Sequence, residues 1–301
     1  MFSLSTAWNA QTAQDAKTLI SQIQVLGFKN IELSFTLSRA VVAGIARLKR
    51  SGGFEISSVH NFCPLPDGIA AEDARFEAYS LSAIKKDERR KAKEATKKTI
   101  RMAKKLGAKV VVLHLGKVDI KDRTMRLYEL MNKGEDIGSL RGQFMEERRS
   151  KAGEHLDVLY DSLDEVADFA VRNDIKLGIE NRYRYKAMPI FEEIGPILED
   201  FKKKNVYYWH DTGHAQVFEF FGYNKHADFL DAFSDRMIGV HLHDITGIHD
   251  HKAPLTGKMD FNMLTPYLKK NTIKVLEPHS GATGIEVKRG FEYLKGLYKD
   301  E

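Results

Sequence analysis

The chain has 301 residues, of which 43% are hydrophobic and 30% are charged, and its formal net charge is +5. This composition is typical of a soluble globular protein, and a chain of this length can bury a large apolar core. It contains no run of the roughly 18 to 20 apolar residues that a membrane helix needs, and its N-terminus lacks the pattern of a signal peptide. The single cysteine, Cys63, excludes an internal disulfide. We therefore expect a cytoplasmic protein without a membrane partner.

Short apolar segments alternate with amphipathic segments along the whole chain. Eight segments read as strands: 2–5, 30–34, 55–60, 109–115, 176–180, 206–211, 237–243 and 273–277. Helical patterns cover 11–26, 39–50, 85–106, 155–171, 190–203, 226–233, 262–270 and 286–298. Strands that alternate with helices predict a parallel sheet, and eight such repeats close naturally into a (β/α)8 TIM barrel. An open doubly wound sheet is the alternative, but no glycine-rich dinucleotide fingerprint follows the first strand.

No linker or low-complexity tract divides the chain, so we expect one barrel domain over residues 1–301. A long polar connection at about 116–154 leaves the C-terminal end of the fourth strand, where loops commonly shape a site. Much of the positive charge lies in the helix predicted over 85–106. In a barrel that helix faces sideways, so we favour a solvated face over a nucleic-acid surface, without excluding nucleic acid.

Acidic residues and histidines fall at the C-terminal ends of six predicted strands. These residues are His60, His114, Glu180, Asp211, His241 and Glu277. Barrel enzymes place their catalytic groups at that end of the strands. One histidine at a strand end is usually a structural residue, but six such positions on one rim favour a metal site.

Strand parity supports the metal site, because alternate side chains share a face. Gly178 and Glu180 share one face of their strand, and Val275 and Glu277 share one face of theirs. Isolated carboxylates inside a barrel would be costly unless they bind a cation. Carboxylates mixed with imidazoles suit Zn, Mn, Fe or Co better than calcium, and Mg is a further candidate for the divalent metal. We expect Glu32, which ends the second strand, to contact an arginine or the backbone rather than the metal.

Five ordered motifs give the chain a resemblance to a known superfamily. They are GIENR at Glu180, WHDTGHA at Asp211 and His214, GVHLHDITG at His241, DHKAP at Asp250 and His251, and VLEPH at Glu277. In their order and spacing they resemble the xylose-isomerase-like TIM barrels. That superfamily includes sugar-phosphate isomerases and epimerases, and the endonuclease IV-type enzymes of AP endonuclease family 2.

The resemblance to the epimerases implies a divalent-metal-dependent sugar or sugar-phosphate isomerase or epimerase. Its metal ligands would be Glu180, Asp211, His241 and Glu277. Glu180 and Glu277 would also transfer the substrate proton through a metal-stabilised enediolate. The substrate would be a small sugar or sugar phosphate, contacted by His214, Arg182, His114 and His60. Arg184 and Lys186 follow Arg182 and could hold a substrate phosphate or carboxylate, although ordinary loop charges are as well supported. A homodimer is plausible.

The resemblance to the endonucleases implies a larger metal cluster. The additional ligands would be His60, His114, His214, His251 and either Asp250 or His249. The segment PLTGKMDF departs from the glycine-rich turn of the family, which leaves the roles of Asp250 and His251 open. The alternative functions are therefore hydrolysis of abasic DNA, dehydration of a cyclic polyol, and metal or sugar binding without catalysis.

Overall fold

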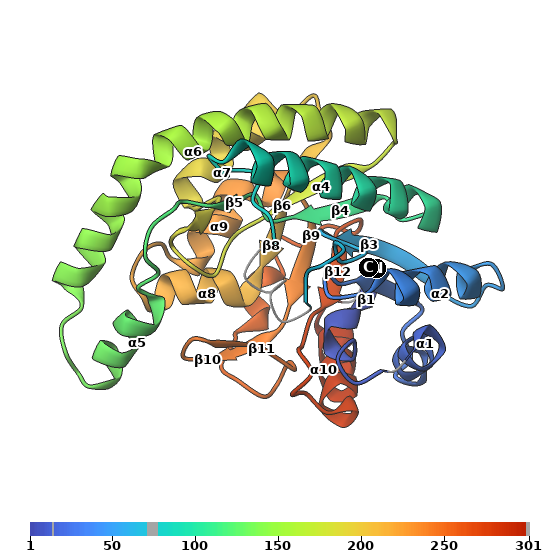
Figure 1. Cartoon of the computed structure of the whole chain (residues 1–301). Coiled ribbons are helices and arrows are strands. Elements are labelled where there is room, and N and C mark those ends of the chain that lie inside the picture. Colours follow the sequence, from blue (N-terminus) through green and yellow to red (C-terminus); the bar gives the residue numbers. More distant parts are fainter. Residues whose placement is uncertain (14, 71–77, 299–301) are drawn as a thin grey trace.

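The computed structural model describes residues 1–13, 15–70 and 78–298. Eight parallel strands form a closed barrel in the order β1-β12-β9-β8-β6-β4-β3-β2 (Figure 1). The strands are β1 (Phe2–Ser5), β2 (Asn30–Leu33), β3 (Glu55–His60), β4 (Val110–Leu113), β6 (Lys176–Glu180), β8 (Val206–Asp211), β9 (Met237–Leu242) and β12 (Ile273–Leu276). The predicted (β/α)8 barrel is confirmed.

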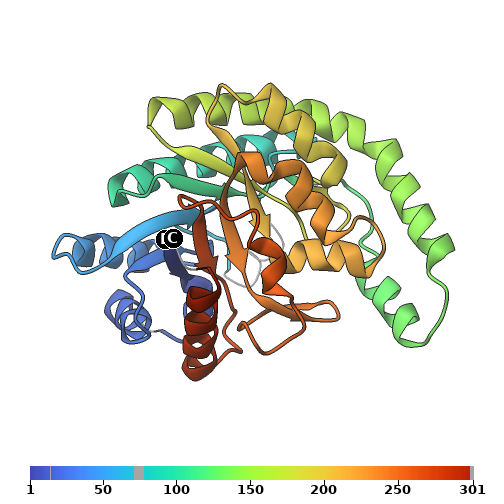
Figure 2. The ribbon, with the colours of Figure 1, turned by 180° about the vertical axis from the view of Figure 1, so that it is seen from behind.

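Helices form an outer layer around this barrel in both views (Figures 1 and 2). They are α1 (Ala16–Val25), α2 (Arg39–Lys49), α4 (Lys86–Leu106), α5 (Thr124–Asn132), α6 (Gly138–Arg172), α7 (Phe191–Asp200), α8 (Thr212–Phe220), α9 (His226–Phe233) and α10 (Gly284–Leu297). Two short antiparallel sheets, β5 (Gly116–Lys117) with β7 (Ala187–Met188) and β10 (Asp244–Thr246) with β11 (His249–Lys252), lie outside the barrel. No helix within the described residues is long and apolar enough to cross a membrane.

The connection after β4 is mostly helical. The helix predicted over 155–171 begins at Gly138, and α5 precedes it. Its early turns bury Phe144, Arg148 and Ala152 at helical spacing, so an arginine interrupts the apolar stripe and hides the period. Arg148 can be buried because its guanidinium donates to both carboxylate oxygens of Glu193, at 2.7 and 3.0 Å. In both views, α5 and the first half of α6 extend outward beyond the barrel (Figures 1 and 2).

The structure differs from the predicted helices at two other places. The helix predicted over 262–270 is wrong, because the chain forms only a 3-10 turn there, Phe261–Leu264. Pro266 explains the difference, since it lacks an N–H donor and restricts the residue before it. Helix α8 was not predicted. It starts directly after β8 with Asp211 as its N-cap, and it is buried on so many sides that it shows no amphipathic period.

The lower barrel is filled by Trp209, which packs with Val110, Val112, Ile273 and Val275. Two glycines on neighbouring strands make room for the indole. A Cβ at Gly178 would lie 3.0 Å from the Trp209 ring, and one at Gly239 would lie 2.1 Å from it. The predicted inward orientation of Gly178 is therefore confirmed. The packed floor leaves the C-terminal ends of the strands as the place for a site.

Candidate metal centre

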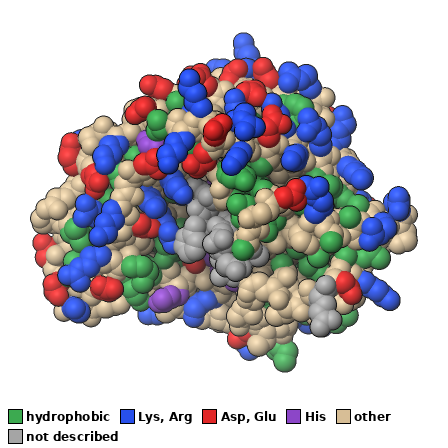
Figure 3. Space-filling view, viewed as in Figure 1, with side chains coloured by type: hydrophobic (Ala, Val, Ile, Leu, Met, Phe, Trp, Pro, Cys, Tyr) green, Lys and Arg blue, Asp and Glu red, His purple; other side chains and the backbone are tan. Residues whose placement is uncertain are grey.

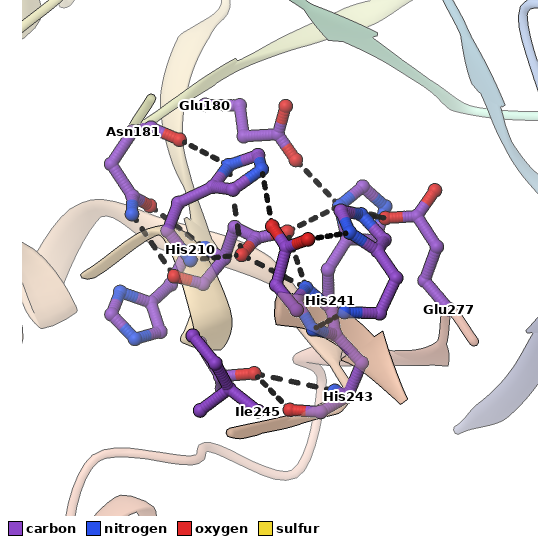
Figure 4. A network of polar contacts seen from close by, with 12 residues as sticks. Glu180, Asn181, His210, His241, His243, Ile245 and Glu277 are labelled. Atoms are coloured by element: carbon purple, nitrogen blue, oxygen red, sulfur yellow. Dashed lines mark hydrogen bonds and ion pairs between the residues drawn. The ribbon is translucent and has the colours of Figure 1, made fainter. Parts of the chain in front are cut away.

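Four side chains meet at the C-terminal mouth of the barrel. Glu180 ends β6, Asp211 ends β8, His241 lies in β9 and Glu277 follows β12. All four are buried, and each offers a ligand atom within 4.8 Å of the others. His241 Nδ1 lies 2.6 Å from Glu180 Oε1, 3.1 Å from Glu277 Oε2 and 3.7 Å from Asp211 Oδ2 (Figure 4). The structure thus brings together the four side chains predicted as metal ligands.

This donor set fits a divalent cation. Three buried carboxylates around one imidazole concentrate negative charge where water cannot screen it, which is costly without a counter-charge. Carboxylate oxygens and an imidazole nitrogen are ligands of the divalent transition metals. Any metal here would use Nδ1 of His241, because this nitrogen faces the carboxylates of Glu180 and Glu277.

The opposite nitrogen of the His241 ring is held by Glu32. Glu32 Oε1 lies 3.0 Å from His241 Nε2, and the Ser58 hydroxyl donates to Glu32 Oε2 at 2.7 Å. The expectation that Glu32 contacts an arginine or the backbone is therefore wrong. Because the strands close into a ring, β2 faces β9 across the barrel, a relation that strand-by-strand reading does not reveal.

The carboxylates shift the protonation of the cluster. Burial would lower the pKa of His241, but the charges of Glu277, Glu32 and Glu180 raise it well above its ordinary value. Burial would raise the pKa of Glu180, but the charge of His241 and hydrogen bonds from His114 and His241 hold it well below its ordinary value. The imidazoles of His241 and His251 likewise lower the pKa of Glu277 to about 2 against the effect of burial. Without a cation, a proton on His241 therefore supplies part of the counter-charge.

A second group flanks the first and shares Glu180 with it. His114 Nε2 lies 2.6 Å from Glu180 Oε2, and His60 Nε2 lies 3.6 Å from the same oxygen. Burial and the Arg182 guanidinium lower the pKa of His114 well below its ordinary value. The neutral ring is the form that binds metal. The structure thus brings His60 and His114, which the sequence predicted as additional ligands or substrate contacts, beside the central group.

A third group contains His214, Asp250 and His251. His251 Nδ1 lies 3.0 Å from Asp250 Oδ1, and His214 Nε2 lies 3.8 Å from Asp250 Oδ2. The sequence left Asp250 and His249 as alternatives. The structure places Asp250 in the group, whereas the His249 ring packs against Tyr128 with centroids 5.6 Å apart.

The unusual PLTGKMDF segment still forms a fixed turn. The Met259 N–H donates to Asp244 Oδ1 at 2.8 Å, and the Lys258 N–H donates to the Ile245 carbonyl at 2.9 Å. A Cβ at Gly257 would lie 2.4 Å from Asp244 Oδ1, so the turn needs glycine there. The turn therefore closes on the β10–β11 hairpin that carries Asp250 and His251.

His243 received no role from the sequence, yet it joins the centre. Its Nε2 lies 3.0 Å from each carboxylate oxygen of Asp211, and its Nδ1 accepts the His251 backbone N–H at 2.9 Å. These contacts place the ring proton on Nε2. His243 lies two residues after His241, so strand alternation could have placed both on one face. Asn181, also missed, accepts the Asp211 N–H at 2.7 Å.

A cavity of about 390 Å³ opens over these groups. Its lining includes the metal-type residues His60, His114, Glu180, His214, Asp250, His251 and Glu277. Arg182 also lines it and donates from Nη1 to Glu180 Oε2 at 3.1 Å. His214 is oriented by the Asn181 carbonyl, 2.9 Å from its Nδ1. A small polar molecule in this cavity would touch both glutamates and the flanking imidazoles.

Comparisons with known proteins agree with this architecture. An uncharacterised protein, y4fM, of Sinorhizobium fredii is 25% identical over 179 residues, which cover 59% of this chain and 49% of that protein. The chain spans about half the length of the curated relatives it matches.

Solved structures share the fold at low identity. A D-tagatose 3-epimerase-like protein has a TM-score of 0.69 at 20% identity, covering 98% of this chain and 96% of that one. An IOLI protein with a bound zinc atom has a TM-score of 0.68 at 13% identity, covering 99% and 97%. The family model described as "Xylose isomerase-like TIM barrel" matches residues 20–297. The chain therefore belongs to the xylose isomerase-like TIM barrel family.

Proposed function

We propose that this protein is a divalent-metal-dependent isomerase or epimerase of a sugar or sugar phosphate. One observation carries the proposal: Glu180 and Glu277 approach the same nitrogen of His241, at 2.6 and 3.1 Å, and both line the cavity. They come from β6 and from the end of β12, which the barrel separates by β8 and β9. Two carboxylates can therefore reach one substrate carbon from different sides.

The residues of the site have separate proposed roles. Glu180, Asp211, His241 and Glu277 would hold the cation, whose charge would stabilise negative charge developing on substrate oxygens. The lowered pKa values of Glu180 and Glu277 keep both carboxylates ionised and able to accept a proton from carbon. After one glutamate has removed the proton, the other must take up a proton from solvent, and its return from the opposite side inverts that carbon. Arg182 donates to Glu180, and His214, which lines the cavity, would contact a substrate oxygen.

The relatives support the same chemistry. Solved structures with this fold include a D-allulose 3-epimerase in complex with D-allulose and a D-psicose 3-epimerase with D-tagatose. The IOLI protein, which has this fold, contains a bound zinc atom, and this supports a metal in the present chain.

The test is solvent exchange into candidate sugars. Metal-loaded protein is incubated in deuterium oxide with ketohexoses and their phosphates, and deuterium on carbon is measured by NMR. We expect deuterium at the carbon next to the carbonyl, and its loss in Glu180→Gln and Glu277→Gln. Glu135→Gln, an exposed position on the connection between α5 and α6, is the matched control. Tight sugar binding without any exchange would instead support a non-catalytic barrel.

A second candidate, metal-dependent phosphodiester hydrolysis, is favoured by the two flanking groups. A one-ion centre does not need His60 with His114, nor His214 with Asp250 and His251. The basic helix α4 does not add support, because Lys93 and Lys97 pair with Glu165 of α6. Blue and red side chains are interspersed over this part of the surface (Figure 3). Nicking of abasic-site DNA by metal-loaded protein, abolished in Glu180→Gln, would establish hydrolysis.

A further inference from the structure

Besides the metal-type residues, the cavity is lined by a group of basic side chains, which we call the cationic wall. Lys117, Arg184 and Lys186 line it together with Arg182, which serves Glu180. Among the described lining residues outside the proposed metal groups, Asp122 is the single carboxylate. A cation bound by the central group would balance the buried glutamates and so reduce their attraction for these basic side chains.

The wall is built on a braced piece of backbone rather than on loose loops. Strands β5 and β7 pair Lys117 with Ala187, and the Val118 N–H donates to the Lys186 carbonyl at 2.9 Å. The antiparallel pairing thereby holds the backbones of the two lysines close together.

Serines and a buried histidine hold the outer side of β5. The Lys117 N–H donates to the Ser82 hydroxyl at 2.9 Å, and that hydroxyl donates to the Lys117 carbonyl at 2.9 Å. A Cβ at Gly116 would lie 2.1 Å from Ser80 Oγ, so the strand passes too close for any other residue. His155 of α6 donates from Nδ1 to the Ser82 carbonyl at 2.7 Å and accepts the Asp119 N–H at 3.1 Å. The long helix α6 therefore supports this wall.

Arg184 is fixed from the other side. Its Nη1 lies 3.1 Å from Asp122 Oδ2, while Asp122 Oδ1 accepts the Thr124 N–H at the start of α5 at 3.0 Å. The next residue, Tyr185, is buried and stacks on Tyr223 with ring centroids 4.3 Å apart. Arg184 and Lys186 flank this anchored tyrosine and both line the cavity.

We propose that the substrate is an anionic sugar whose charged group binds to Lys117, Arg184 and Lys186. The charged group is a phosphate ester or a carboxylate, both of which guanidinium and ammonium donors bind by charge-assisted hydrogen bonds. The anion would fix one end of the sugar while its reacting carbon faces Glu180 and Glu277. The position of that carbon rests on the proposed isomerase function, but binding of the anion does not.

Three hexoses that differ only at carbon 6 test the proposal: glucose 6-phosphate, glucuronate and glucose. Their binding to the metal-loaded protein is measured by calorimetry. We expect at least one charged hexose to bind about tenfold or more tightly than glucose, as charge-assisted hydrogen bonds predict. Tighter binding of the phosphate identifies a sugar phosphate, and tighter binding of glucuronate identifies a sugar acid.

The double variant Lys117→Gln with Lys186→Gln should bind all three hexoses equally weakly. Lys133→Gln, exposed just after α5 and outside the cavity, removes a charge elsewhere and should keep the preference. Unchanged thermal unfolding shows that the variants are folded. Equal binding of the three hexoses to the wild type, no binding of a charged hexose, or a preference that survives in the double variant would overturn the proposal. Deuterium exchange is scored separately, so a failed isomerase function and a failed anion site give different results.

Discussion

Glu32 and His241 lie 3.0 Å apart across the barrel mouth, from Oε1 to Nε2, and both side chains are fully buried. The carboxylate fixes which imidazole nitrogen carries a proton and so leaves Nδ1 to face Glu180 and Glu277. Ser58 holds the second oxygen of Glu32, so the carboxylate itself cannot turn away. A residue outside the ligand set thereby orients the one imidazole of the central group.

Replacement of Glu32 by Gln should weaken metal binding about 10- to 100-fold, because a neutral amide oxygen stabilises the ring proton on His241 Nε2 less than a carboxylate does. Competition with a chromophoric chelator measures the affinity. Glu55→Gln, an exposed position on β3, should leave it unchanged. An affinity equal to wild type in Glu32→Gln would remove Glu32 from the site.

Metal affinity should rise with pH, and the rise should continue above about 6.5, the ordinary imidazole value. The reason is the raised pKa of His241: its proton is retained at neutral pH and must leave before Nδ1 can bind metal. Titration of metal into protein at a series of pH values, in buffers of different ionisation enthalpy, counts the protons released. A pH-independent affinity would contradict this protonation scheme.

Replacement of Gly239 by Ala should destabilise the protein by about 1–3 kcal/mol, because the new methyl group overlaps the Trp209 ring. Denaturant unfolding measures the change. Gly296→Ala is the matched control, since a Cβ there meets no described residue within 4 Å and the position lies inside α10. That control should be neutral or slightly stabilising.

Replacement of Arg148 by Met should destabilise the protein by about 3–5 kcal/mol, because the Glu193 carboxylate would remain buried without its partner. Arg149→Met, the neighbouring residue in an exposed ion pair with Glu146, should leave stability close to wild type. If Arg148→Met unfolds at the same denaturant concentration as wild type, the buried pair between α6 and α7 does not stabilise the fold.

The sequence predicted the barrel because its strands are short apolar runs that end in polar residues, as in 206–211 and 237–243. It also predicted the central ligands, since each ends or nearly ends such a run. It failed where burial does not follow hydrophobicity. The buried Arg148 interrupts the apolar pattern of the early turns of α6, and the buried residues of α8 show no helical periodicity.

Contacts across the barrel and within hairpins could not be predicted from the sequence either. Glu32 meets His241 only when the sheet has closed. The choice between Asp250 and His249 depends on the pairing of β10 with β11, which one residue of register would reverse. The anchoring of β5 by Ser80, Ser82 and His155 joins three segments that no local pattern connects.

The indole of Trp209 determines from which side a molecule can enter and leave the cavity. Because it closes the interior beneath His241, with ring centroids 5.1 Å apart, the described part of the chain leaves the cavity closed at its inner end. A reactant must then arrive, and a product depart, through the same outer mouth. Product and reactant would occupy the same closed-ended cavity one at a time, so accumulating product should act as a competitive inhibitor.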